Sequence, residues 1–163
     1  MNTPAPDLFQ ATRASRLADG LSDDQAAVLA GLLQLRHCQA GEVLAREGEV
    51  DNRLYVIVEG QFAIVKHLGQ DDEETLLTLS AGDFAHELGF LDGKARYASL
   101  RAATAAQVLV LERARLESLV DSQPRLLYAV MRALLRTGHG VNTRLAVQAA
   151  ELTNYIVKQH GRY

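Results

Sequence analysis

The sequence predicts a mainly β domain with flanking helices (α+β): an antiparallel β-roll or jelly roll followed by one long helix. Between about Leu35 and Leu111, short apolar runs alternate with period two and are separated by glycines, which is typical of an antiparallel roll of about eight short strands. Beyond Pro124 the apolar residues recur at steps of three and four, which predicts a long amphipathic helix.

The first segment, residues 1–34, is predicted to be helical. Apolar residues between Leu8 and Leu17 fit a short helix that ends at Gly20. Ser22 is a good N-cap for a second helix, because Gln25 stands three residues later in capping-box position. We therefore expect a small helical pair ahead of the roll.

The β-roll is expected over residues 35–122. Its clearest strands are Val43–Ala45, Leu54–Val58, Gln61–Lys66, Thr75–Leu79 and Val108–Leu111. The Glu59-Gly60 pair lies between two of these runs and predicts a tight hairpin.

The last segment, residues 123–163, is predicted to be one helix that begins with Pro124 at its first position and Ser122 as a nearby cap. Its apolar seam follows heptad positions: Leu127, Met131, Leu134, Gly138, Val141, Leu145, Gln148, Leu152 and Tyr155. One small roll cannot bury so long a stripe, so we expect residues 124–158 to form a homodimer. Gly138 and Gly140 interrupt the seam, which indicates a kink, a close helix approach, a hinge or a ligand contact.

Composition excludes several classes of protein. The 163 residues suffice for one domain with a long helix, and 48% hydrophobic and 23% charged residues are typical of soluble proteins. A net charge of -3 and a pI near 5.9 do not favour binding to nucleic acid or a membrane surface. With Cys38 as the single cysteine, no signal peptide and no membrane-length apolar stretch, we expect a cytoplasmic, bacterial protein.

No motif indicates an enzyme or a metal site. The five histidines lack HxH or HExxH spacing, and His86-Glu87 is the only adjacent pair of such ligands worth noting. Nucleophile motifs, a P-loop and a dinucleotide fingerprint are also missing from the sequence. A haem or gas sensor on the same fold is an alternative that predicts a coloured protein.

The stretch from Ala81 to Ala102 carries the candidate site. After Gly82-Asp83, a helical turn carries Glu87, and a loop then delivers Arg96 to the start of a strand expected over residues 97–103. A carboxylate accepts hydrogen bonds from hydroxyls, and a guanidinium holds a phosphate with a planar fork of donors. The pair therefore suits a sugar phosphate, although a surface ion pair would show the same spacing.

Three parts of this stretch resemble the phosphate-binding cassette of the cyclic-nucleotide-binding domain family: Gly82-Asp83-Phe84, Glu87-Leu88, and Arg96 with Ala98 and Arg101-Ala102. The family includes bacterial catabolite activator proteins, kinase regulatory subunits and nucleotide-gated channels. The resemblance covers roughly residues 35–135. It implies a cyclic nucleotide ligand, cAMP or cGMP, with the ribose 2'-hydroxyl on Glu87 and the cyclic phosphate on Arg96.

The resemblance also implies that backbone amides near residues 86–88 help to bind the ligand. The long helix would dimerise and close over the base through Thr137, Asn142 or Thr143. The expected ligand-binding residues are Phe84, His86, Glu87, Leu88, Arg96, Tyr97, Ala98, Thr137 and Asn142. We expect Arg96→Ala to abolish binding while sparing the fold.

Two residues depart from the family pattern. His86 stands where the family usually has glycine, and Tyr97 stands where it usually has serine or threonine. Both add bulk, so either the ligand is seated differently or the cassette has lost it. We expect a non-catalytic, homodimeric regulator that passes ligand occupancy to a downstream protein and carries no DNA-binding domain. The alternative is a protein-interaction module that binds no nucleotide.

Overall fold

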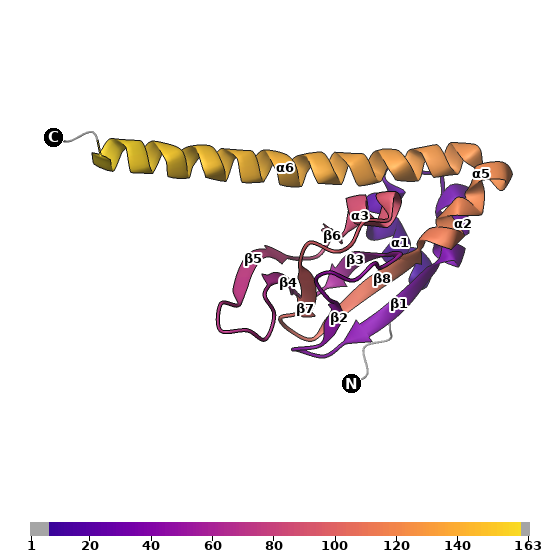
Figure 1. Cartoon of the computed structure of the whole chain (residues 1–163). Coiled ribbons are helices and arrows are strands. Elements are labelled where there is room, and N and C mark those ends of the chain that lie inside the picture. The colour runs from indigo at the N-terminus through magenta and orange to yellow at the C-terminus, as the bar shows by residue number, and fades with distance from the viewer. Residues whose placement is uncertain (1–6, 161–163) are drawn as a thin grey trace.

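The computed structural model describes residues 7–160, apart from the side chains of residues 88, 139–142, 144, 145, 159 and 160. Figure 1 shows a β-roll with short helices at one end and a single long helix, α6 (Pro124–His160), running across it. The N-terminal helices are α1 (Leu8–Ala14), a 3-10 turn (Arg16–Ala18) and α2 (Asp23–Leu32). Two short helices, α4 (Arg113–Glu117) and α5 (Leu119–Ser122), connect the roll to α6.

The N-terminal helices begin at side-chain caps. The predicted capping box of α2 is confirmed, because Ser22 accepts from the Gln25 amide and Gln25 accepts from the Ser22 amide. The first helix ends earlier than expected. At Ser15 the backbone becomes extended and the hydroxyl donates to the carbonyl of Thr12 at 2.7 Å, so the chain reaches Gly20 through the 3-10 turn.

The roll consists of two four-stranded antiparallel sheets, as the sequence predicted for the fold class. One sheet has the order β1 (Leu33–Cys38), β8 (Ala106–Glu112), β3 (Arg53–Glu59), β6 (Phe84–Ala85). The other has the order β2 (Val43–Ala45), β7 (Ser99–Ala102), β4 (Phe62–Lys66), β5 (Glu74–Leu79).

The expected hairpin at Glu59-Gly60 is wrong, because β3 and β4 belong to different sheets. Gly60 has φ +83°, and a Cβ on it would lie 2.5 Å from the carbonyl oxygen of Ala105. Glycine is therefore required at this close approach, where the chain steps from one sheet to the other instead of folding back on its neighbour.

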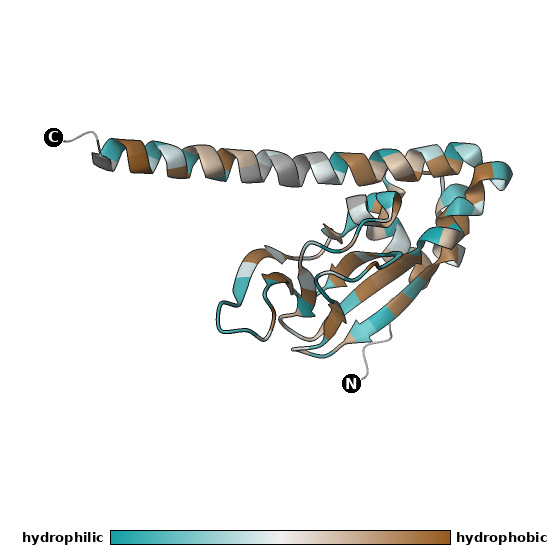
Figure 2. Cartoon of the chain, viewed as in Figure 1, coloured by the Kyte–Doolittle hydropathy of each residue, from teal (hydrophilic) through white to brown (hydrophobic). Residues whose placement is uncertain are grey.

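Two apolar clusters hold the domain together. The cluster between the sheets includes Tyr55, Phe62 and Leu100, all fully buried. The second cluster joins the roll to its helices and includes Phe90 and Leu134. Figure 2 shows the hydrophobic strands of the roll beneath the first part of α6. The start of α6 is thus fixed to the roll by burial of apolar surface.

The packing of α6 changes the predicted dimer seam. Leu134 and Gly138 were expected to face a second chain, but both are buried within this one, whereas Met131 is exposed. The helix continues without a break through residues 138–140. From Thr143 onwards every side chain that the structure describes is exposed.

The cap predicted at Ser122 is also absent from its expected place, since its hydroxyl donates back to the carbonyl of Ser118. Within residues 7–160, no helix combines the length and hydropathy needed to cross a bilayer.

Candidate functional site

The candidate site lies in the segment that joins the two sheets, between β6 and β7. The segment is anchored at its start, because the Gly82 amide donates to the Ile57 carbonyl at 2.8 Å and the Ile57 amide donates to the Asp83 carbonyl at 3.0 Å. Phe84 then enters the core in β6. The short helix α3 (Glu87–Asp92) and a loop over residues 93–98 follow. A fixed strand thus positions everything that comes after it.

His86 links β6 to α3 with a left-handed backbone, φ 70° and ψ 30°. Its imidazole lies on Gly89, where an added Cβ would be 2.1 Å from Cε1 and 2.4 Å from Nε2. Nε2 is buried and has no hydrogen-bond partner among the described residues. Burial and, to a smaller extent, the positive charge of Arg96 outweigh the opposing effects of Asp51 and Asp92 and lower the pKa of His86 to about 4. The side chain is therefore neutral at pH 7.

Glu87, the first residue of α3, faces the long helix. A Cβ built on Gly138 would lie 3.5 Å from its Oε1, so the carboxylate touches α6 where that helix has no side chain. Burial raises the pKa of Glu87. Glu87 forms no ion pair with any residue that the structure describes. The site therefore contains a carboxylate that has no ion-pair partner in the described part of the chain.

Arg96 is buried, and it lies in the loop rather than at the head of a strand as predicted, since β7 begins only at Ser99. Its Nη2 donates to Asp51 Oδ2 at 2.9 Å and to the Arg53 carbonyl at 3.3 Å. The guanidinium carbon lies 5.3 Å from the centre of the Tyr55 ring. Its Nε is buried without a partner among residues 7–160. One edge of the guanidinium is thus held in place, while another donor is unused.

Asp51 is a residue of the candidate site that the sequence did not predict. It binds Arg96, accepts from Arg53 Nε at 2.9 Å and accepts from the Tyr55 hydroxyl at 3.2 Å. Burial acts to raise the pKa of Asp51, but the bond from Arg53 and the charge of Arg96 outweigh it and lower the pKa. Nothing in the local sequence joins Asp51 to Arg96, because the two are 45 residues apart.

Tyr97 does not fill the space beside Arg96, because its side chain is turned out and the residue is 71% exposed. Lys66 Nζ lies 4.3 Å from the centre of the Tyr97 ring and donates to the Tyr97 carbonyl at 2.9 Å. Ala98 is half-buried beside it. The bulk expected from Tyr97 is therefore directed into solvent and along the edge of the site.

The remaining predicted site residues divide between the roll and α6. Thr137 is buried on α6, next to Gly138. Thr143 is exposed. The side chains of Leu88 and Asn142 lie outside the described part of the structure. Their assignment to the ligand stays a prediction.

A pocket of about 300 Å³ opens beside α3. It is lined by His86, Glu87, Gly89, Lys94 and Tyr97, among others. Three of the predicted site residues thus meet at one pocket. Arg96 is buried and is not among the residues that line this pocket. No cluster of three metal-binding side chains occurs among the described residues.

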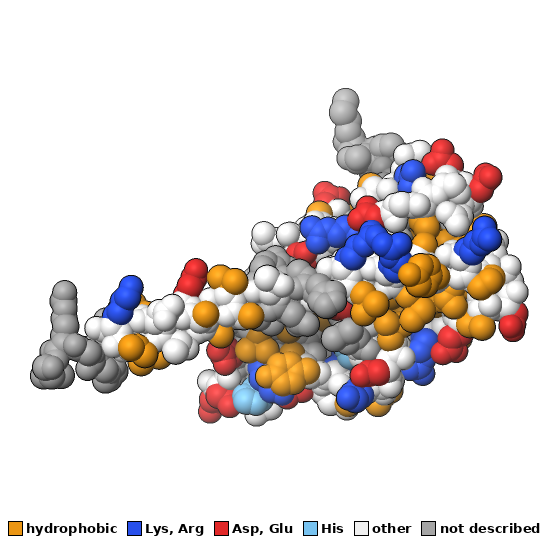
Figure 3. Space-filling view, turned by 90° about the horizontal axis from the view of Figure 1, so that it is seen from above, with side chains coloured by type: hydrophobic (Ala, Val, Ile, Leu, Met, Phe, Trp, Pro, Cys, Tyr) orange, Lys and Arg blue, Asp and Glu red, His pale blue; other side chains and the backbone are white. Residues whose placement is uncertain are grey.

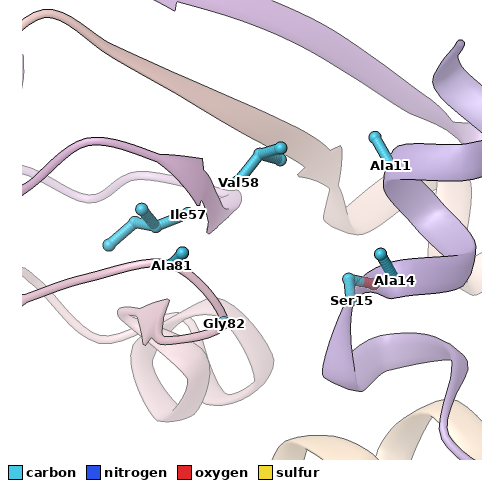
Figure 4. Close-up of a pocket in the computed structure, with 7 residues that line it drawn as sticks. All are labelled: Ala11, Ala14, Ser15, Ile57, Val58, Ala81 and Gly82. Atoms are coloured by element: carbon cyan, nitrogen blue, oxygen red, sulfur yellow. The ribbon is translucent and has the colours of Figure 1, made fainter. Parts of the chain in front are cut away.

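A second pocket, of about 280 Å³, lies between α1 and the turn at Ala81-Gly82. Figure 4 shows Ala11 and Ala14 of α1 and the following Ser15 on one side of it, across from Val58 and Ala81. No charged side chain lines this pocket. It therefore lacks the groups that would hold an anion, and the pocket beside α3 is the better candidate.

Comparison with known proteins finds relatives of two kinds. A protein of Rhodopseudomonas palustris named as a potassium channel protein is 33% identical over 116 residues, which are 71% of this chain and 28% of that protein. The CRP-like cAMP-activated global transcriptional regulator of Mycobacterium tuberculosis is 27% identical over 127 residues, which are 78% of this chain and 57% of the regulator. This chain therefore spans less than two thirds of either relative.

The fold has a solved counterpart. The crystal structure of a cyclic nucleotide-binding domain from Methylobacillus flagellatus superposes with a TM-score of 0.73 at 22% identity, covering 93% of this chain and 83% of that one. In addition, the model of the cyclic nucleotide-binding domain family matches residues 35–123, which include the whole cassette from β6 to β7. The chain belongs to the cyclic nucleotide-binding domain family.

Proposed function

We propose that this chain is a non-catalytic regulatory domain that binds a cyclic nucleotide and passes its occupancy to a partner protein. The observation that carries the proposal is the unused Nε of Arg96, a buried cationic donor held in place by Asp51. A buried donor without a partner is costly, and an anionic ligand would satisfy it with a charge-assisted hydrogen bond. The M. tuberculosis relative, named as cAMP-activated, supports cAMP as the first ligand to test.

Glu87 supplies the second contact. Its carboxylate accepts a hydrogen bond from the ribose 2'-hydroxyl. This bond takes the place of hydrogen bonds to water that the carboxylate loses through burial. Because Glu87 already touches α6 at Gly138, and Thr137 is buried next to it, the ligand would lie between the roll and the long helix. A ligand that contacts both the roll and α6 favours the arrangement in which these two parts are close. The size of this population shift is set by the difference in the ligand's affinity for the close and the open arrangement.

The long helix carries the signal in a homodimer. Three exposed apolar residues, Tyr128, Met131 and Leu135, follow one another at steps of three and four on the face of α6 that points away from the roll. Figure 3 shows hydrophobic side chains gathered on this face beside basic ones. Leu152 and Ile156 are exposed further along the same helix. A second copy of α6 would bury these residues. We place this dimer in the cytoplasm.

Binding is tested by a thermal-shift screen of the wild-type chain with cyclic AMP, cyclic GMP and cyclic dinucleotides, followed by calorimetry. A ligand of the folded state must raise the midpoint as it saturates the protein. Glu87→Gln should weaken binding roughly tenfold to a hundredfold, because a hydrogen bond to a charged group contributes about 1.5 to 3 kcal/mol. Arg96→Lys, which keeps the charge beside Asp51 but loses the fork of donors, should weaken it at least as much.

The matched control is Glu117→Gln, since Glu117 lies on α4, is paired with Arg113 and does not line the pocket beside α3. Its affinity should equal that of the wild type. If Glu87→Gln and Arg96→Lys also bind like the wild type, the assignment of the site is overturned.

The second candidate function is a protein-interaction module with an unused pocket. It is favoured by one observation, the imidazole of His86 within the pocket. A screen in which no cyclic nucleotide shifts the midpoint at millimolar concentration would support this alternative.

A further inference from the structure

Two buried nitrogen atoms at the candidate site lack hydrogen-bond partners. They are His86 Nε2 and Arg96 Nε, and they account for two of the three such side-chain atoms found among the described residues. The residues are close enough for the charge of Arg96 to act on the imidazole. Buried polar atoms are almost always bonded in native proteins, so two unbonded nitrogen atoms at one place indicate a missing partner.

The position of the imidazole is a built feature of the fold. The imidazole can occupy this position only because residue 89 is glycine, since the Cβ of any other residue would lie 2.1 Å from the ring. The left-handed backbone of His86 also directs the side chain to this place, and histidine is one of the few residue types that adopt this conformation readily. The chain thus reserves space for the ring beside Glu87 and Arg96.

Burial and the charge of Arg96 keep the ring neutral in the unliganded chain. Arg96 opposes protonation from the loop before β7, whereas Asp51 and Asp92 favour it from the loop before β3 and the end of α3. Glu87 and Lys94 line the same pocket. Burial and Arg96 prevail, and the pKa of His86 falls to about 4. An anion bound to Arg96 would cancel the repulsive charge and add an attractive one.

We propose, on the basis of the proposed function, that His86 is itself a ligand-binding residue. Its imidazole takes up a proton from solvent when the nucleotide binds, and Nε2 donates a hydrogen bond to the anionic group of the nucleotide. Affinity then rises as the pH falls. An opposite charge in contact shifts a pKa by about one to three units. A rise of about two units gives a roughly tenfold gain in affinity between pH 7 and pH 5, with about 0.8 proton taken up per ligand at pH 5.

The experiment titrates the whole chain with cyclic AMP by calorimetry at pH 7 and pH 5, each in two buffers of different ionisation enthalpy. The dependence of the observed heat on the buffer gives the number of protons taken up. His86→Asn is the matched control, because asparagine tolerates the left-handed backbone and keeps a donor but cannot be protonated. The neighbouring carboxyl groups of Glu87 and Asp92 are present in both proteins, so a difference in proton uptake between the two proteins belongs to His86.

We expect proton uptake and a roughly tenfold gain in affinity at pH 5 in the wild type, and the loss of both in His86→Asn. His86→Gly, which also adopts the left-handed backbone, serves if the asparagine variant does not fold. If the wild type binds but the variant shows the same uptake and pH dependence, this inference is overturned and the proposed function stands. If the wild type binds no cyclic nucleotide at either pH, both are overturned.

Discussion

Arg96 and Asp51 form an ion pair of 2.9 Å in which their side chains are only 3% and 6% exposed. A pair this deeply buried is strongly destabilising to break, because the remaining charge has neither its partner nor water. Arg96 is thus part of the folded core as well as a candidate ligand contact. This geometry replaces the expectation that removing Arg96 would spare the fold.

We predict that Arg96→Ala and Asp51→Asn both lower the free energy of unfolding, by up to about 3 to 5 kcal/mol. Asp51→Asn should have the larger effect, because it leaves two cations, Arg96 and Arg53, beside a neutral amide, whereas Arg96→Ala leaves Asp51 with Arg53. Urea denaturation measures both variants.

The control for the buried pair is Lys94→Ala, which removes the exposed partner of Asp92 at 3.8 Å. It should change the free energy of unfolding by less than about 1 kcal/mol. Losses of equal size in all three variants would show that the Arg96–Asp51 pair does not stabilise the fold.

The main features of the fold could be predicted from local patterns. Alternating apolar residues identified the strands, and the Ser22–Gln25 capping box identified the start of α2, because both signals lie within a few residues. The hairpin at Gly60 could not be judged in this way. A glycine turn looks the same whether the next strand pairs with the previous one or enters the opposite sheet.

The candidate site was predicted only in the part that is continuous in sequence. Glu87 and Arg96 stood out within one stretch, but Asp51 comes from another loop and reaches Arg96 only in the folded chain. The roles of Leu134 and Gly138 were hidden for a similar reason. A heptad pattern does not distinguish packing on the chain's own roll from packing on a second helix, and here α6 uses both residues internally.

We predict that Glu87→Gln makes the unliganded protein more stable at neutral pH. Burial raises the pKa of Glu87 above its ordinary value of 4.5, so the folded state holds the proton more tightly than the unfolded state. Well below pH 4.5 the carboxyl is protonated in both states and does not affect the free energy of unfolding. As the pH rises through the folded-state pKa, the wild type loses stability and the variant does not.

Thermal denaturation of the wild type and Glu87→Gln between pH 4 and pH 8 checks this sign. The difference in midpoint should be smallest at pH 4 and grow towards pH 8. A variant that is less stable than the wild type at pH 8 would show that the carboxylate has a stabilising partner, contrary to the structure.

We predict that Gly138→Ala stabilises the chain but weakens the ligand. Alanine is favoured over glycine inside a helix by about 1 kcal/mol, and its Cβ would meet Glu87 Oε1 at 3.5 Å, an ordinary contact. The same methyl group would narrow the space between α6 and Glu87 where the ribose is proposed to lie. Urea denaturation and nucleotide calorimetry measure the two effects.

Gly31→Ala on α2 provides the control for Gly138→Ala, since apart from its chain neighbours and the backbone of its own helix no described atom lies within 4 Å of the Cβ it would add. It should leave nucleotide affinity unchanged. If Gly138→Ala binds the nucleotide as tightly as Gly31→Ala does, the ligand does not occupy the space beneath α6.

We predict that glutamate at Met131 and Leu135 prevents dimerisation. These residues are 38% and 50% exposed on the outer face of α6, and a dimer would bury them, so two charges on each chain would have to be desolvated against their copies. Sedimentation equilibrium should give a dimer for the wild type at high micromolar concentration and a monomer for the double variant. Val50→Glu, at a 64% exposed position on the roll, should sediment like the wild type. A wild type that is monomeric at that concentration would refute the α6 interface, and the apolar stripe would then have to face a different partner.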